Sequence, residues 1–312
     1  MGRLRQLANP NALRLRVNRW LRRFDLGLYR PSSVESQGGD RLVHAPVALP
    51  PGAETALHAG NPRLAALRAR YRGHPAAAHT GWSDLRLEGQ LELTWFRGDS
   101  QYLYQGRGTP EAAYALSANY VARHDRLGLL DALDEDGAFG ALTFEVEGRR
   151  VSRDLLDSVL EIGALAAWLG ADVEVVATDA VPVSTFLCEY YLAFRGCLRA
   201  RVVPLDDVHA VFEAGGFDAA VNVHSFGEAP RAAVRWWLER IATAGIPRLL
   251  IVHGEPELYA LESDLSRSRY DDVLDELGYR RVALRPKYEH SATVQRLGIF
   301  PAWYHAFERA SR

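Results

Sequence analysis

Short apolar runs alternate with amphipathic segments throughout the second half of the chain. Four runs predict β-strands, at Val173–Thr178, Arg201–Pro204, Phe217–Val223 and Arg248–Val252. Apolar residues at helical spacing predict helices after them, at Ser184–Phe194, Asp207–Glu213, Arg231–Ala244 and Ser268–Leu277. This alternation indicates an α/β fold with a doubly wound parallel sheet. The β-branched run Val173–Thr178 is typical of a strand buried on both faces. Arg281–Arg285 and Ala302–Phe307 are expected to form a closing hairpin.

The first half of the chain is less regular. Residues 1–30 combine many arginines with apolar positions at helical spacing, which predicts a basic amphipathic helix. We favour a helix packed on its own domain over one that binds a membrane surface, since only one face is apolar. Residues 31–62 are rich in proline and glycine and predict a linker. Further elements are expected as a strand at Leu85–Trp95, a helix at Glu111–Asp131 and a short strand at Ala141–Val146.

Composition narrows the functional classes. The 37 Lys and Arg nearly balance the 39 Asp and Glu, which argues against a general nucleic-acid binder. No apolar run is long enough to cross a bilayer, and the N-terminal segment lacks the apolar stretch of a secretory signal. Cys188 and Cys197 have no metal-ligand spacing and are expected to be reduced, which favours the cytoplasm. Lys287 is the only lysine, and this arginine bias favours a bacterial source with a GC-rich genome.

Acidic residues follow two of the predicted strands. In open α/β sheets, ligands bind outside the carboxyl ends of the strands. Asp179 follows the run Val173–Thr178, where a carboxylate can accept hydrogen bonds from both ribose hydroxyls of a nucleoside cofactor. It can equally cap the helix that comes next. Asp206 follows Arg201–Pro204, where it faces an adenine amino group or, more simply, caps the next helix.

The end of Phe217–Val223 is the most polar strand end in the chain, with Asn222, His224, Ser225 and Glu228. Histidine has an ordinary pKa of about 6.5, so His224 can take a proton from a sugar hydroxyl, and Glu228 can orient it or serve in its place. The alternative is that His224 and Ser225 hold the turn through backbone hydrogen bonds. His253 is a weaker second candidate. Neither histidine has a partner at zinc-ligand spacing, and no metal is expected.

Seven strings, in order, resemble the putative sugar O-methyltransferase family. They are Gly98–Ser100 with Tyr102, Tyr104 and Gln105, then Glu135–Gly140, Ser152–Ser158, Thr178–Leu187, Glu189–Leu192, Asn222–Phe226 and Trp236–Leu238. The resemblance covers roughly residues 95–310. It implies an N-terminal region over residues 1–90 and a Rossmann-like methyltransferase domain over residues 91–312, with its core at about 151–312. It also implies S-adenosylmethionine as the methyl donor and a saccharide or glycoconjugate hydroxyl as the acceptor.

Site residues follow from the resemblance and the strand ends together. His224 and Glu228 are expected to be catalytic. Residues expected to bind the cofactor are Glu161, Gly163, Asp179, Ala180, Asp206 and Asn222. Residues expected to bind the substrate are Tyr102, Gln105, Arg153 and Ser225.

The chain departs from the family where the cofactor loop is expected. Such enzymes have a first strand, a loop of the form E-x-G-x-G-x-G and a helix before the strand that ends at Asp179. Here only Glu161-x-Gly163 remains of the loop. One interpretation makes Val159–Ile162 the first strand and Leu165–Leu169 a short helix. We favour the other, a single helix at Asp154–Leu169 capped by Ser152, because a polar stripe runs along one side of it.

A single helix in this segment leaves the sheet without its first strand and impairs cofactor binding. A βαβ crossover cannot fit in either interpretation, since it needs about 30 residues or more. One rival hypothesis is therefore a non-catalytic protein that keeps the fold in order to bind a saccharide or a partner. Another is a different nucleotide-sugar enzyme, which Asp179 alone does not distinguish.

Overall fold

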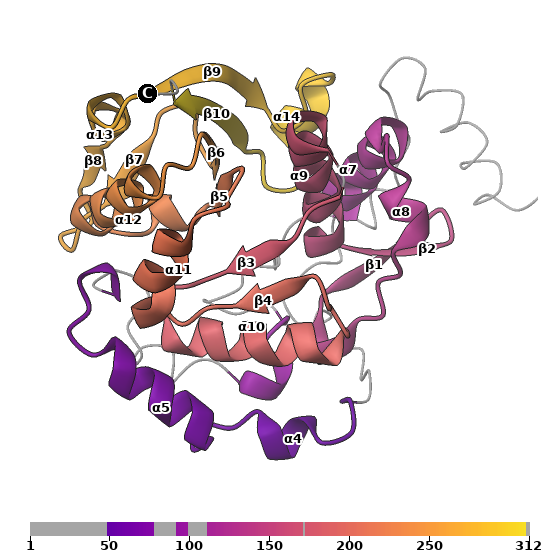
Figure 1. Ribbon diagram of the computed structural model, residues 1–312. Coiled ribbons are helices and arrows are strands. Elements are labelled where there is room, and N and C mark those ends of the chain that lie inside the picture. Colours follow the sequence, from indigo (N-terminus) through magenta and orange to yellow (C-terminus); the bar gives the residue numbers. More distant parts are fainter. Residues whose placement is uncertain (1–48, 78–91, 99–110, 171, 310–312) are drawn as a thin grey trace, which may run out of the picture.

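The computed structural model describes residues 49–77, 92–98, 111–170 and 172–309 (Figure 1). The predicted basic helix, most of the predicted linker and the proposed boundary after residue 90 lie outside these residues. The helices are α4 Ala53–Ala56, α5 Pro62–Tyr71, α7 Glu111–His124, α8 Leu129–Ala132, α9 Arg153–Leu169, α10 Pro182–Phe194, α11 Val208–Ala214, α12 Arg231–Thr243, α13 Asp271–Glu276 and α14 Ala292–Leu297. Short 3-10 turns are η2 Pro75–Ala77, η3 Leu93–Trp95, η4 Ala138–Gly140, η5 Leu205–Asp207 and η6 Ser225–Gly227. The strands are β1 Thr143–Val146, β2 Arg149–Ser152, β3 Val175–Ala177, β4 Ala200–Val202, β5 Ala220–Val223, β6 Arg248–His253, β7 Tyr259–Leu261, β8 Arg267–Arg269, β9 Tyr279–Pro286 and β10 Trp303–Arg309.

The strands form small sheets in a mixed α/β fold rather than one continuous doubly wound sheet. The largest sheet has the order β5-β6-β10-β9, in which β5 and β6 are parallel and β10 runs antiparallel to both of its neighbours. A separate pair, β3 and β4, is parallel, and two antiparallel hairpins join β1 to β2 and β7 to β8. The expected strands and helices from residue 173 onward are thus confirmed as elements, including the β9–β10 pairing, although β8 replaces the start of the helix expected at Ser268–Leu277.

A single helix, α9, occupies the segment in which the family resemblance implies a cofactor loop. Ser152 caps it, since its hydroxyl accepts a hydrogen bond from the Leu155 N–H at 3.1 Å. The helix ends at Gly170, whose φ of 86° favours glycine. The expectation of one helix here is confirmed. Within the described residues, β3 and β5 lie in separate sheets, and no strand joins the two sheets.

The two halves of α9 pack against different partners. Leu155, Leu156 and Val159 join the core around α7. Further along, Leu165 and Trp168 pack against Val252 of β6 and Tyr304 of β10. The helix therefore covers one face of the four-stranded sheet and ties it to the helices that precede it in the chain (Figure 1).

Side chains of β3 and β5 are unexpectedly exposed. Val175 is 48 % exposed and Val221 is 46 % exposed, whereas Leu249 and Ile251 of β6 are fully buried. The expectation that Val173–Thr178 is buried on both faces is therefore wrong. The physical reason is that β3 and β5 each pair along one edge only, so no strand flanks their other edge within the part of the chain that the structure describes.

Two further expectations for the first half are corrected. The helix expected at Glu111–Asp131 breaks into α7 and α8, because Gly128 adopts a left-handed conformation with φ 67°. Leu93–Trp95 forms a 3-10 turn rather than the end of a strand. Cys188 and Cys197 are free thiols. Among the described residues, the helices are too short or too polar to span a membrane.

Candidate functional site

His224 lies immediately after β5 in a strained backbone conformation. Its N–H donates to the Val252 carbonyl at 2.9 Å, which continues the pairing of β5 with β6. Its φ of 61° lies in the left-handed region, which is uncommon for a residue with a Cβ. The 3-10 turn η6 follows at once and carries Ser225 at the surface. The sequence expectation of a polar strand end is thus confirmed in its position.

Asn222 and Ser225 hold the turn that presents His224. The Asn222 Oδ1 atom accepts from the Phe226 N–H at 3.1 Å, and its Nδ2 atom donates to the Ser225 hydroxyl at 2.7 Å. Both side chains, expected to bind cofactor and substrate respectively, thus have a role within the loop. Glu228 lies exposed at the end of the same turn.

The His224 imidazole is half-buried and uncharged at neutral pH. Burial first and the nearby Arg153 guanidinium second lower its pKa to about 4, against the opposing charge of Asp157. The ring also lies 5.9 Å from the ring of Phe300, at an interplanar angle of 76°. A neutral imidazole has one ring nitrogen free to accept a proton.

Arg153, expected to bind the substrate, makes contacts within the protein. Its guanidinium carbon lies 3.8 Å from the centre of the Phe300 ring, and its Nε atom donates to the Asp157 carboxylate at 3.2 Å. Asp157 also accepts from the Nζ atom of Lys287. The structure therefore brings β5, α9 and the segment after β9 together around His224. The sequence reasoning did not connect Lys287 or Phe300 with this site.

Glu161 lies on α9 one turn after Asp157. Burial and, to a smaller extent, the neighbouring Asp157 carboxylate together raise the pKa of Glu161 to about 8, so this side chain is mostly protonated at neutral pH. Tyr304 pairs with Val252, which pairs with Val223, so all three side chains point towards the face that α9 covers. The buried Tyr304 hydroxyl has no hydrogen-bond partner among the described residues.

Asp179 lies in the turn between β3 and α10, whose N-cap residue is Val181 and has no side-chain cap bond. One carboxylate oxygen accepts from the Val181 N–H at 2.7 Å, and the other accepts from the Ser184 hydroxyl at 2.6 Å. Burial raises the pKa of this carboxyl, and these hydrogen bonds oppose the effect. Ala180 packs at the edge of the apolar cluster around α10. Asp179 therefore holds the turn that leads into α10, and it is not the N-cap residue that the sequence offered as the alternative.

The remaining residues expected to bind ligands fall elsewhere. Asp206 lies in η5 after β4 and accepts from the Arg70 Nε atom at 2.7 Å. Gly163 lies inside α9, where a Cβ would meet no atom within 4 Å. Tyr102 and Gln105 lie outside the described residues. Nor do the described residues contain a group of three or more potential ligands that could hold a metal ion.

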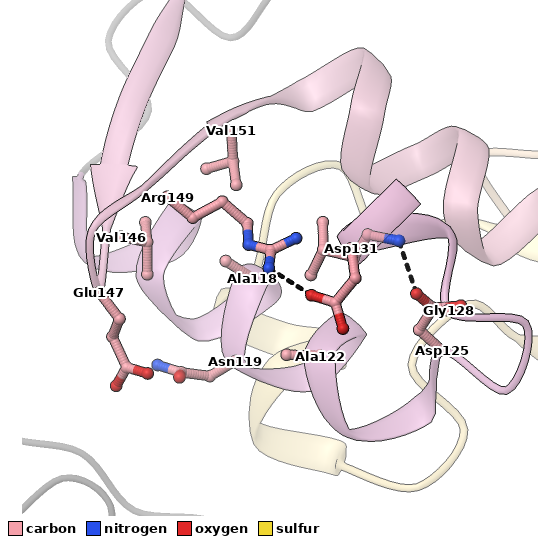
Figure 2. Close-up of a pocket in the computed structure, with 11 residues that line it drawn as sticks. Ala118, Asn119, Ala122, Asp125, Gly128, Asp131, Val146, Glu147, Arg149 and Val151 are labelled. Carbon is pink, nitrogen blue, oxygen red and sulfur yellow. Dashed lines mark hydrogen bonds and ion pairs between the residues drawn. The ribbon is translucent and has the colours of Figure 1, made fainter. Parts of the chain in front are cut away.

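A separate hollow of about 250 Å³ lies between α7, α8 and the β1–β2 hairpin (Figure 2). Arg149 forms an ion pair with Asp131 across it, and Asp125 accepts from the Leu130 N–H at 2.6 Å. Ala118 and Val151 contribute apolar walls. None of the residues expected to bind cofactor or substrate lines this hollow, so it is not the site around His224.

Comparisons with known proteins give similarities to solved structures alone. No family model matches the chain, and no curated protein matches it. Among solved structures, the chain is similar to the [4+2]-cyclase SpnF, at 12% sequence identity and a TM-score of 0.35. The match covers 55% of this chain and 86% of that chain. A similarity at this level carries no argument about activity, cofactor or substrate.

Proposed function

We propose that the chain is an S-adenosylmethionine-dependent O-methyltransferase that acts on a saccharide hydroxyl, with His224 as the base. The observation that carries this proposal is the backbone of His224, with φ 61° and ψ −31°. A non-glycine residue in such a region costs on the order of 1–3 kcal/mol, and strain of this kind clusters at functional sites. The resemblance of seven strings to sugar O-methyltransferases supplies the donor and the class of acceptor.

His224 suits a modest catalytic role. Because its pKa is lowered to about 4, the imidazole is unprotonated throughout the neutral range. A hydroxyl becomes acidic as its oxygen gains a new bond to carbon, so a weak base can accept the proton late in the transfer. General-base help of this kind contributes about 10²–10⁴-fold, and most of the remaining rate comes from positioning the two reactants. Exposed Ser225 and Glu228 lie on the same turn, where they can contact the acceptor.

The residues named for S-adenosylmethionine fit it unequally. The Asp179 carboxylate uses at least two of roughly four acceptor positions to hold the turn before α10, and the remaining capacity can accept from a ribose hydroxyl. Glu161 and Gly163 do not fit, because their backbone groups lie inside the hydrogen-bonded ladder of α9. We therefore assign the cofactor to the end of β3, beside Asp179. When bound, S-adenosylmethionine supplies the methyl group.

The second candidate is a non-catalytic protein that binds a saccharide or a partner with the same surface. One observation favours it. The segment that matches the cofactor loop by sequence is the helix α9, so no glycine-rich turn is available there to approach a cofactor. The two candidates differ in whether S-adenosylmethionine binds at all.

Calorimetric titration with S-adenosylmethionine distinguishes the two candidates. We expect micromolar binding by the unmodified chain and a loss of about tenfold or more in Asp179→Asn, which keeps one oxygen for the turn before α10 but removes the carboxylate. Ser184→Ala is the matched control, since it removes one hydrogen bond of that turn and keeps the carboxylate. Its affinity should be unchanged. No heat at millimolar ligand, from a protein that melts cooperatively, would contradict the enzyme and support the binding protein.

A further inference from the structure

Lys287 is the only lysine among 37 basic residues, and its side chain is 3 % exposed. It directly follows β9, and its N–H donates to the Ala302 carbonyl at 2.8 Å. Its ammonium group donates to the Asp157 carboxylate, to the Phe300 carbonyl at 3.2 Å and to the Ile299 carbonyl at 3.4 Å. A lysine has three donors, and each finds an acceptor here. An arginine has a planar fork with five donors, which does not match this arrangement.

These contacts belong to a network of ion pairs and hydrogen bonds that surrounds Phe300. Asp157 accepts from both Lys287 and Arg153, and Arg153 in turn covers the face of the Phe300 ring at 3.8 Å. Lys287 meanwhile binds the Phe300 carbonyl. Phe300 has a φ of 41°, a strained value for a residue with a Cβ. Lys287 thus holds the backbone of Phe300 and Arg153 holds its ring, and both cations pair with Asp157.

The Phe300 ring is in turn a wall for His224. The two rings lie 5.9 Å apart and are nearly perpendicular. Among charged and titratable groups, Arg153 and Asp157 of α9, Lys287 after β9 and His253 of β6 act on His224. Two strained residues, Phe300 and His224, therefore face each other, and the network fixes the first of them.

We propose that Lys287 is a positioning residue, which acts through Asp157, Arg153 and Phe300 to hold the His224 imidazole in one orientation. A contribution of this positioning to catalysis rests on the proposed function of His224 as a base. The positioning itself does not, since it is measurable in the free protein without a methyl donor or a saccharide.

The test is the titration of the His224 imidazole in the full chain, followed by NMR and assigned with a His224→Gln spectrum. The unmodified protein is expected to titrate at about 4. Lys287→Met removes a positive charge and frees Phe300, so the pKa of His224 should rise by about one unit or more. Lys287→Arg keeps the charge but not the geometry, and Phe300→Leu keeps the carbonyl that Lys287 binds but removes the wall. Both should also shift the titration and broaden the imidazole signals.

Arg285→Met is the matched control, because it removes a positive charge on β9 two residues before Lys287 without touching the network. Its titration should equal that of the unmodified chain. If Lys287→Arg and Phe300→Leu melt cooperatively and leave the His224 titration unchanged, Lys287 does not position His224. These two variants decide the matter even if Lys287→Met fails to fold. A protein that shows the shifts yet binds no S-adenosylmethionine would keep this inference and refute the proposed enzyme.

Discussion

Arg97 and Glu135 form a buried ion pair that links the segment after η3 to the loop between α8 and η4. The Arg97 Nη2 and Nη1 atoms donate to the two carboxylate oxygens at 2.9 and 3.2 Å. Glu135 also accepts from the Ser152 hydroxyl at 2.5 Å and from the Gly137 N–H at 2.8 Å. Burial alone would raise the pKa of Glu135, but the bonds from Arg97, Ser152 and Gly137 lower it overall.

We expect Glu135→Gln to lower the free energy of unfolding by about 3 kcal/mol at pH 7, because the buried Arg97 charge loses its bidentate partner and keeps only the more distant Asp154 and Asp136 carboxylates. Since the folded-state pKa of Glu135 is lowered, its contribution to stability is full above its unfolded value of 4.5 and is lost as the pH falls through the folded value. The difference between the variant and the unmodified chain should therefore shrink in acid. Urea unfolding at pH 7 and pH 3 measures both effects. Asp275→Asn, in an exposed pair with Arg280, should change stability by about 0.5 kcal/mol or less.

At the residue scale, the sequence singled out His224 and Arg153 but not Asp157, Lys287 or Phe300, which lie around them. A polar strand end is visible in a local pattern, because strand and turn are adjacent in the chain. The bond between Lys287 and Asp157 joins residues 130 positions apart, and no spacing rule reports it. The one available signal was the presence of a single lysine in a chain that otherwise uses arginine.

At the scale of elements, α9 shows how far a local pattern reaches. Its polar stripe and its Ser152 cap predicted the helix, since both depend only on residues within a few turns. The family resemblance pointed to a loop in the same segment. The helix formed because Gly163 is a single interruption among good helix formers, whereas the loop needs several closely spaced glycines.

Gly163→Ala should therefore stabilise the protein by about 0.5–1 kcal/mol, because glycine costs that much in a helix interior and a Cβ here meets open space. Thermal and urea unfolding measure the change. Gly298→Ala is the contrasting control, because its Cβ would lie 2.6 Å from the Val294 carbonyl oxygen, and it should destabilise. A stability loss in Gly163→Ala would mean that Gly163 has a conformation or a neighbour that the helix does not provide.

At the scale of the whole molecule, burial divides the strands into two groups. Side chains of β6 lie in the middle of the largest sheet and are enclosed, whereas Val175 of β3 and Val221 and Val223 of β5 are 39–48 % exposed. Sequence pattern alone gave both groups the same prediction, because an apolar run looks alike whether or not a neighbouring strand is present. Which strands are flanked depends on the complete set of strands, and a helix, α9, stands where the family resemblance implies a further strand.

Val175→Thr and Val221→Thr should each change the free energy of unfolding by about 0.5 kcal/mol or less, since both side chains are already in contact with solvent. Ile251→Ala, at a fully buried position of β6, should cost about 2–5 kcal/mol. Chemical denaturation of the three variants gives the comparison. A cost of about 2 kcal/mol for either valine would mean that its side chain is covered in solution.

Because Lys287 is the only lysine and is buried, its chemical modification reports local opening of the protein around it. Reagents that acylate amines need an accessible, uncharged amine. The Lys287 side chain is buried, and its amine stays charged because Asp157 raises its pKa against the opposing effect of burial. Acylation at Lys287 then requires the contact between α9 and the segment after β9 to open. The rate of acylation at Lys287, measured by peptide mass mapping, would give the rate at which these elements separate, without any engineered probe.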